Sequence, residues 1–577
     1  MGSTHLRTAT ALTVIALASG AVARGQSLAP QAAPAAPTQA APSAVTQAPQ
    51  PGTGQAPGPV KRLSLDDAVR LALEQNLNLQ VQRLEPQTQD LLISQVKTAY
   101  TPLFSTSLVG TSDDSPVNSF LSGATGTLTN NSFQAVVSAQ QQFSWGGNLG
   151  IDWNTSRQET NSAYSSPNPV LRGSLNFAYT QPLLRNFKID STRQQLLVTQ
   201  KNREISDVQL QETILSTVRD VKASYWDLAY AVASLRVQRQ SLELAQESLK
   251  NNRSRVDIGT MAPIDIVEAE AEVAQREEAV ILAEAAVTRA EDALRALVFD
   301  PATPDFWTMR LELTEQPAFA AQVIDLDAAI TNAMANRTDL LQAKKNIEAS
   351  DINIRYFRNQ VLPDLNLEAG YGVTGQGGTL YNFGDGFPPT VIGRLDEGYG
   401  TVMSRMFRND FPNWSLAVRV GYPLGRSNAE AGLARARVEY QQSQIQLRNL
   451  ELQVVTQVRE VARQVNTNRK RVDSTRASQQ LAARRLEAEQ KKFAAGMSTS
   501  FFVIQAQRDL AQAQNAALQA VLDYNRSLVD FDTVQQAPVG GSTGGVSVVS
   551  VAGSGSLTST LTGPTSAANR NAASARF

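Results

Sequence analysis

A seven-residue apolar period is the sequence feature that most restricts how this chain can fold. Apolar residues occupy every seventh position through 221–256 without exception, and through 458–493 with Gln479 as the one polar member. Such a period is typical of helices that pack together as coiled coils. The helical pattern continues without a strong break over 185–256, which predicts a helix of about 72 residues, or ~108 Å. A helix of this length indicates a protein that bridges a distance.

Each long helical pattern ends at a glycine and then resumes. The breaks read VDIGTMAPIDIVEAE around Gly259 and FAAGMSTSFFVIQAQ around Gly496. Glycine readily adopts the left-handed conformation that ends a helix, and Pro263 suits the first turn of the next helix. We therefore expect two helix–turn–helix tips, near 259–265 and 496–502.

The paired tips belong to a longer series of landmarks that occurs twice in the same order. The series comprises the segments LSLDDAVRLALEQNLNL and VIDLDAAITNAMANRTDL, Pro102 with Pro363, Pro182 with Pro423, and the two tips. Four landmarks in one order indicate an internal duplication. The expected boundaries are 63–298 for the first repeat, 299–322 for the connection and 323–535 for the second repeat.

Segments with a period of two lie between the paired prolines. In NWSLAVRVGY apolar and polar residues alternate, and three similar segments begin near positions 103, 171 and 364. The alternation predicts a sheet with one apolar and one polar face. A half-buried sheet of a soluble protein would read alike, but strands of about ten residues with aromatic ends favour a membrane barrel. Four strands cannot close a barrel wall, so several chains must share it; three chains would supply about twelve strands.

An additional hairpin is expected in the first repeat. Residues 132–156 contain two alternating segments joined at Gly146 and Gly147, which is a tight-turn signal. Two interpretations remain open. The hairpin adds two strands to the wall, giving about eighteen in a trimer, or it folds outside the wall.

Composition excludes most catalytic and metal sites. The chain has no cysteine, and its one histidine is His5, so thiolate, disulfide and histidine-based chemistry is absent from the expected fold. The net charge of −1 argues against a nucleic-acid partner. We expect no catalytic residue, metal or cofactor, and a non-enzymatic protein. An enzyme based on Asp and Glu alone has no pocket signature to support it.

The two ends of the chain have compositions unlike its centre. Residues 1–23 combine Arg7, a short apolar run and an A-x-A site, as in a secretory signal peptide. An Ala/Pro/Gln-rich disordered tether is expected at 24–62, and a Gly/Ser/Thr-rich disordered tail at 536–577. No apolar run reaches the ~20 residues of a membrane helix, so membrane insertion would require strands.

Strand pairs between long helices, duplicated once behind a signal peptide, resemble the TolC-like outer-membrane efflux protein family. The resemblance covers 63–535 and depends on the repeated L-x-x-A opening, the Tyr-Thr-Pro and Tyr-Pro-Leu junctions, and the two tips. It implies an α+β membrane protein in which a long antiparallel coiled-coil helical barrel continues into a trimeric transmembrane β-barrel. The implied location is the cell outer membrane, with the helices extending into the periplasm.

The resemblance also implies function and partners. The chain would be the exit duct of a tripartite efflux pump or a type I secretion system, passively conducting small molecules or proteins. Its implied partners are two further copies of itself, outer-membrane lipid, a periplasmic adaptor and an inner-membrane transporter of the RND, ABC or MFS type. The alternative is a secreted or surface trimeric coiled-coil adhesin without a channel.

In the family the tips meet the adaptor and surround the periplasmic entrance. The implied docking residues are Gly259, Thr260, Pro263, Gly496 and Met497. Positions that are often acidic in the family hold Phe502 and Gln505 here, and the positions of a tyrosine–arginine lock hold Phe493 and Ser498. Asp265 matches an acidic position of the first tip, and Glu268 follows one turn later. We expect a Phe502 ring with these two carboxylates nearby to narrow the entrance, although ordinary first-turn helix acids would look the same.

Overall fold

The computed structural model describes residues 60–117, 126–162, 165–315, 318–385, 390–425 and 427–539. The predicted signal peptide, most of the tether and most of the tail lie outside these residues. Two expected boundaries need correction. Strand β1 (Val60–Leu63) already begins inside the predicted tether, because it pairs in parallel with β6 (Arg310–Leu313). The predicted tail is packed as far as Val539, which contacts a buried core cluster.

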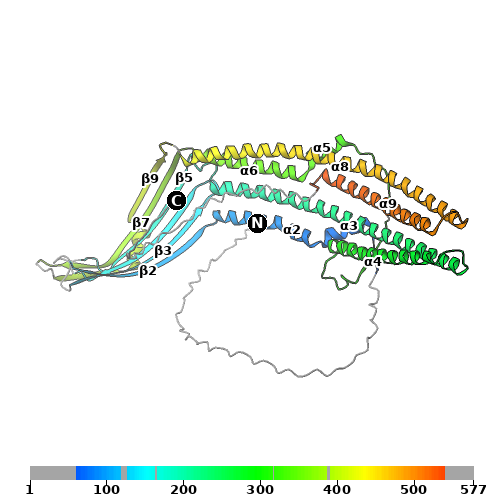
Figure 1. The fold of residues 1–577 in the computed structure, drawn as a ribbon. Coiled ribbons are helices and arrows are strands. Elements are labelled where there is room, and N and C mark those ends of the chain that lie inside the picture. Colours follow the sequence, from blue (N-terminus) through cyan, green and yellow to red (C-terminus); the bar gives the residue numbers. More distant parts are fainter. Residues whose placement is uncertain are drawn as a thin grey trace, which may run out of the picture. The chain divides into compact units, whose positions relative to one another are not determined.

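Two long helices, each followed by a shorter one, dominate the described fold (Figure 1). Helices α3 (Ser191–Asp257) and α8 (Asn428–Ala494) each contain 67 residues, and α4 (Ile264–Val298) and α9 (Ser500–Val534) each contain 35. The predicted long helices are confirmed, and α3 alone rises ~100 Å. Helix α3 starts later than predicted because the Asp190 side chain caps it by accepting from the backbone N–H of Arg193 at 2.7 Å.

Four shorter helices pack alongside the long ones. They are α1 (Leu65–Gln75), α2 (Leu77–Lys97), α5 (Leu326–Asn336) and α6 (Thr338–Gln360), and a 3₁₀ turn, Thr98–Tyr100, follows α2. Helix α2 packs against α3, α3 against α6, and α6 against α8. The helices that connect to the sheet therefore lie side by side in the order α2, α3, α6, α8.

The heptad positions supply the cores between these helices. Val221 and Leu228 of α3 are fully buried with Leu294 of α4, and Val465 and Val472 of α8 are buried against α9. Towards the tips these positions become only partly buried, apart from Leu486. The apolar period thus acts mainly within each chain, along the shared length of α3 with α4 and of α8 with α9.

A single antiparallel sheet contains every predicted strand. Its strands are β2 (Leu103–Pro116), β3 (Thr127–Gln142), β4 (Asn148–Thr160), β5 (Val170–Pro182), β7 (Asp364–Phe383), β8 (Val391–Glu397) and β9 (Phe411–Gly421). The order is β2-β3-β4-β5-β7, after which β9 pairs with the first half of β7 and β8 with its second half. The β3–β4 hairpin lies within this sheet, between β2 and β5.

The strand register gives the sheet two chemically different faces. Leu175 of β5 lies opposite Trp153 of β4 and Val373 of β7, and Leu365 of β7 lies opposite Val420 of β9. This apolar face is largely exposed in the single chain; Trp414, Leu416 and Val418 are 61–77% exposed. The opposite face carries Ser, Asn, Gln and charged side chains, including the pair Arg419–Glu368. The predicted division into an apolar and a polar face is confirmed.

Among the described elements, strands β1, β6 and β8 and helix α7 (Tyr399–Phe407) had no counterpart in the sequence analysis. Helix α7 interrupts the return from β8 to β9 and packs against β5 and β7. Its contacts are with the apolar face of the sheet, because Gly173, Gly375 and Gly377, which lie opposite Val402, share that face with Leu175 and Val373. The sheet is therefore partly covered on this side by a helix of its own chain.

Candidate functional site: helical tips and strand–helix junctions

The two helical tips have the same backbone structure. Gly259 and Gly496 both have a φ of 77°, the left-handed region that favours glycine. In the first tip the N–H of Thr260 donates to the carbonyl of Arg255 at 2.9 Å, and in the second the N–H of Met497 donates to the carbonyl of Lys492 at 2.9 Å. Both are Schellman motifs, which satisfy the last carbonyls of α3 and α8.

The loops beyond the glycines lead directly into the returning helices. Pro263 immediately precedes α4 and has helical dihedral angles, φ −59° and ψ −26°. Exposed apolar side chains gather on both tips, and they are Ile258, Ile264, Val267, Met497, Phe501 and Phe502. The tips therefore offer an apolar surface that the single chain leaves uncovered.

The residues expected to form a gate are only partly brought together. Phe501 and Phe502 form an edge-to-face pair with ring centroids 5.6 Å apart, and both are 52% exposed. Gln505 donates to Asp509 at 2.9 Å. Among the described residues, Asp265 and Glu268 have no hydrogen bond or ion pair through their carboxylates. The single chain thus supplies the carboxylates and the phenylalanines without joining them.

The positions expected to hold a lock make contacts of another kind. The Arg255 guanidinium lies over the Phe493 ring, 4.3 Å from its centroid, so α3 and α8 meet through a cation–π contact. Ser498 donates to Glu489 at 3.0 Å. Hydrogen bonds from Lys492 and Ser498 lower the pKa of the Glu489 carboxyl below its ordinary value. Glu489 is therefore ionised at neutral pH.

A buried polar cluster joins the two hairpins just behind the tips. Glu272 of α4 is 2% exposed and accepts from Arg508 of α9 at 2.5 and 2.8 Å and from Arg276 at 2.7 Å. The hydrogen bond to Glu272 raises the pKa of Arg508. Asn252 of α3, also 2% exposed, donates to the Ser500 hydroxyl at 2.7 Å. These contacts fix α3 and α4 against the start of α9.

Sequence analysis missed this cluster. Glu272 and Arg508 are 236 positions apart, and each reads as an ordinary charged residue on a helix face. The offset between the repeats aligns Asp265 with Phe502, but it gives no indication of which charges meet across the hairpins. A buried carboxylate can be recognised only once its helix neighbours are known.

The predicted junction prolines all lie between a strand and a helix. Pro102 precedes β2, Pro363 precedes β7, Pro182 is the last residue of β5, and Pro423 follows β9. Pro182 is buried, whereas Pro102 and Pro423 are exposed. A proline lacks the backbone N–H that would continue the hydrogen bonding of a helix or a β-sheet. It therefore suits the junction between a strand and a helix.

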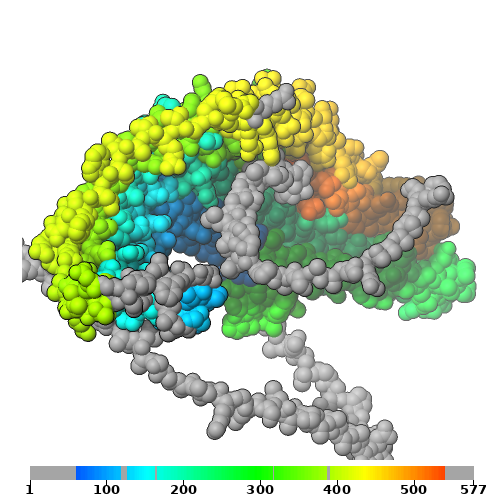
Figure 2. All heavy atoms as spheres, turned by 90° about the vertical axis from the view of Figure 1, so that its left-hand side faces the viewer, coloured from blue at the N-terminus to red at the C-terminus, as the bar shows by residue number. Residues whose placement is uncertain are grey.

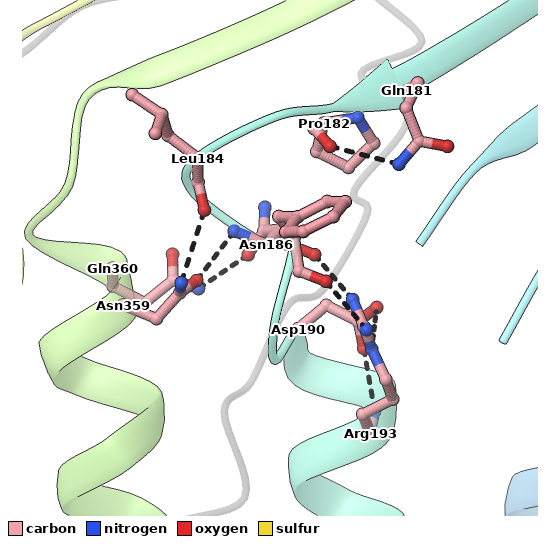
Figure 3. A network of polar contacts seen from close by, with 9 residues as sticks. Gln181, Pro182, Leu184, Asn186, Asp190, Arg193, Asn359 and Gln360 are labelled. Carbon is pink, nitrogen blue, oxygen red and sulfur yellow. Dashed lines mark hydrogen bonds and ion pairs between the residues drawn. The ribbon is translucent and has the colours of Figure 1, made fainter. Parts of the chain in front are cut away.

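The junction at Pro182 is held by a polar network that connects the two halves of the chain (Figure 3). Asn359 of α6 accepts from the N–H of Asn186 at 2.7 Å and donates to the Leu184 carbonyl at 3.3 Å. Gln360 donates to the Asn186 side chain at 2.6 Å. Asn186 has a φ of 63°, so these bonds hold a tight turn that few residues adopt.

The turn of the additional hairpin rests on the same junction. A Cβ added at Gly146 would come within 2.8 Å of the Arg193 guanidinium and 3.1 Å of the Asn186 carbonyl. Trp145 donates from its indole nitrogen to the Tyr179 hydroxyl at 3.2 Å and stacks on Phe143 with centroids 4.3 Å apart. The β3–β4 hairpin is therefore packed against the end of the helical part.

The sequence profile of the family "Outer membrane efflux protein" matches residues 148–298 and 329–534, more than half of the chain. The chain belongs to this family. It is thus an outer membrane efflux protein, located in the outer membrane. Of the residues that the structure describes, no helix has both the length and the apolar composition needed to cross a bilayer.

Solved structures share the fold of this efflux protein. A membrane protein from Pseudomonas aeruginosa is 15% identical with a TM-score of 0.58, covering 82% of this chain and 93% of that one. The outer membrane protein VceC from Vibrio cholerae is 15% identical with a TM-score of 0.56, covering 82% and 96%. The CmeC outer membrane channel from Campylobacter jejuni is 15% identical with a TM-score of 0.57, covering 82% and 85%. No curated protein matches the chain.

Proposed function

We propose that three copies of this efflux protein close into one transmembrane β-barrel that continues into a helical tunnel, and that the assembly is the passive exit duct of a tripartite efflux pump or a type I secretion system. The observation that carries this proposal is that each border of the described part of the chain has both an unpaired edge strand and an exposed apolar helix face. One border is formed by β2 and α2, and the other by β9 and α8. The edges are complementary in strand direction and in apolar surface.

The sheet supplies the first half of the argument. β2 pairs only with β3, and β9 pairs only with β7, among the described strands. The six strands β2, β3, β4, β5, β7 and β9 alternate in direction, so β2 of one copy would lie antiparallel to β9 of the next. An open edge in hydrocarbon leaves N–H and C=O groups unpaired at a cost of several kcal/mol each. Closure with further copies removes both edges.

The helices supply the second half. Helix α2, which leads into β2, exposes Leu77, Leu84 and Leu91 at a spacing of seven. Helix α8, which follows β9, exposes Val438, Ile445 and Leu452 at the same spacing. Figure 2 presents α8 in yellow and orange along one border of the described part. Two exposed heptad stripes on opposite borders fit a coiled-coil contact between neighbouring copies.

The strand count sets the expected width of the barrel. Six strands per chain give about eighteen in a trimer, and barrel diameter grows roughly in proportion to strand number. The apolar face would meet lipid and the polar face would line a water-filled lumen. A duct of this width suits a passive conduit whose selectivity depends on lumen charge and diameter.

The tips would serve as the periplasmic entrance. Their exposed apolar residues fit a docking surface for a periplasmic adaptor linked to an inner-membrane transporter. In a ring of three copies, the Asp265 and Glu268 carboxylates would gather near the Phe502 side chains and favour cations. Replacing both acids with Ala and measuring single-channel cation preference tests this; unchanged preference would leave them as ordinary helix acids.

Cysteine crosslinking tests the assembly directly, because the natural chain contains no cysteine. One cysteine on β2, such as Ser107→Cys, is combined with a series of cysteines along β9. We expect covalent dimers and trimers on oxidation in membranes. The control pairs the same β9 positions with Asn154→Cys in the central strand β4, which should not crosslink. Absence of any β2–β9 crosslink between chains would contradict the ring.

Conductance tests the width. Deletion of 132–158 removes most of β3 and β4, and we expect a narrower pore with a smaller single-channel conductance. An unchanged conductance in a folded, membrane-inserted variant would show that the hairpin does not form part of the barrel wall.

A further inference from the structure

Helix α7 packs on three strand glycines, which are Gly173, Gly375 and Gly377. Val402 is fully buried against β5 and β7, and Met406, which is 3% exposed, lies against Gly173 of β5. A Cβ at Gly375 would overlap the backbone carbonyl of Val402, and one at Gly377 would lie 2.9 Å from a Val402 methyl group. The close approach of the helix therefore requires glycine at these strand positions.

The C-terminal end of α7 is hydrogen-bonded to the neighbouring strands. The Arg405 guanidinium donates to the Gln376 carbonyl at 2.6 Å and to both oxygens of Glu397 at 2.7 Å. Just beyond the same end of the helix, the Tyr371 hydroxyl of β7 donates to Asn409 at 2.9 Å. The helix is thus held in a defined place on the apolar face.

Helix α7 lies at the position along the strands where the apolar face of the sheet changes from apolar to charged residues. On β4 the apolar residues Ile151 and Trp153 are followed on the same face by Arg157 and Glu159, which form an ion pair of 2.8 Å. Arg157 lies opposite Leu171, which lies opposite Gly377 beneath α7. This end of the sheet is the one distant from the strand–helix junctions. The change from apolar to charged residues therefore marks one boundary of the apolar band.

The last residue of α7 and the residue that caps its C-terminus match an interfacial environment. Phe407 is 77% exposed. The Arg408 side chain is 65% exposed, and its nearest acidic partner, Asp410, is 4.0 Å away. An apolar ring beside an exposed guanidinium is typical of residues at the boundary between acyl chains and headgroups.

We propose that α7 is an interfacial helix that lies among the lipid headgroups of the outer leaflet, with Phe407 at the acyl boundary and Arg408 on anionic headgroup phosphates. The inference depends on the proposed function in one respect, namely that the apolar face meets lipid. It adds a lipid-binding element, built from a β-strand return, to the outside of the barrel wall.

Spin labelling tests this placement in the full chain. Phe407→Cys introduces a single cysteine, which is labelled with a nitroxide after reconstitution into vesicles. We expect its accessibility to apolar oxygen relative to a water-soluble nickel complex to fall between two controls. The controls are Val418→Cys on the apolar face, where oxygen should dominate, and Asn176→Cys on the polar face, where nickel should dominate.

Each outcome has a definite meaning. A fully aqueous label at 407, or one shielded from both reagents, would overturn the inference. If the label at 418 is itself aqueous, the sheet does not meet lipid and the proposed function fails. A nickel-dominated label at 407 together with an oxygen-dominated label at 418 would contradict only the role of α7.

A second variant tests the headgroup contact. Arg408→Glu is added to the labelled Phe407→Cys chain and compared in vesicles of phosphatidylcholine alone and of phosphatidylcholine with phosphatidic acid. We expect nickel accessibility at 407 to rise in the anionic vesicles through charge repulsion and to change little in the zwitterionic ones. An equal change in nickel accessibility in both kinds of vesicle would show that Arg408 does not bind anionic headgroup phosphates.

Discussion

Glu272 and Arg508 form an ion pair that joins the first helical hairpin to the second, although the two residues are 236 positions apart. The Glu272 side chain is 3% exposed and that of Arg508 is 45% exposed, so one partner is buried and the other lies at the surface. A buried carboxylate that loses a partner keeps its desolvation cost. The pair therefore contributes to holding the two hairpins together near the tips, beside the Asn252–Ser500 hydrogen bond.

We expect Arg508→Ala to lower the free energy of local opening of α4 and α9 by about 1–3 kcal/mol, because Glu272 would retain only Arg276. Hydrogen exchange of the tip amides measures this. Arg485→Ala is the matched control, since Arg485 pairs with Asp509 on the surface with 59% of its side chain exposed, and such pairs contribute about 0–1 kcal/mol. Equal effects of the two variants would contradict the assigned role of Glu272.

Gly496→Ala should weaken the second tip through its backbone alone. A Cβ at this position meets nothing within 4 Å, so the expected loss of about 1–2 kcal/mol comes from the left-handed conformation. The measurement is amide exchange of the last turn of α8. Gly398→Ala is a suitable control, because Gly398 is equally open but has a φ of −79°. No difference between the two would argue against the left-handed cap.

Gly375→Ala should displace α7 from the sheet, because the added Cβ would overlap the Val402 carbonyl. The expected result is faster proteolysis and faster amide exchange in 399–407. Gly393→Ala, in the neighbouring strand β8, meets its nearest atom at an ordinary 3.6 Å and should leave α7 in place. A protected α7 in Gly375→Ala would show that the close contact is not required.

A four-membered ion network between α3 and α6 should make this region sensitive to acid. Lys201 contacts Glu204 and Glu348 at 2.9 Å, and Lys345 contacts Glu204 at 2.7 Å. Hydrogen bonds from Lys345 and then Lys201 lower the pKa of Glu204 below 4.5, and a hydrogen bond from Lys201 does the same for Glu348.

A lowered carboxyl pKa contributes stability that is complete above about pH 4.5 and is lost as the pH falls through the lowered value. We expect the wild-type protein to lose this contribution on acidification, whereas a Glu204→Gln, Glu348→Gln variant has none to lose. Because the four side chains are 24–48% exposed, the difference should stay below about 1 kcal/mol and shrink in high salt. Thermal unfolding from pH 7 to pH 3 would reveal it, and parallel curves would contradict it.

Much of this fold could be predicted from local patterns. The period of seven in 221–256 and 458–493, the glycines at 259 and 496, and the period of two around 364–373 each reflect backbone geometry within one element. A residue's neighbours at fixed spacing decide which face is buried and where a helix must end. Long helices, tips, strands and the two faces of the sheet were therefore available from the amino-acid sequence.

The remaining features depended on contacts between residues far apart in the chain. The place of β3 and β4 between β2 and β5 is decided by edge pairing, which leaves no mark on the hairpin's own sequence. Helix α7 packs on Gly173, Gly375 and Gly377. Glycines contribute nothing to the alternation of apolar and polar residues, so the sequence does not indicate this packing surface. Likewise Glu272 and Arg508 become a pair only because α4 and α9 approach each other. Sequence periodicity determined the elements, whereas through-space packing decided their partners, because partner choice depends on distances that no local spacing encodes.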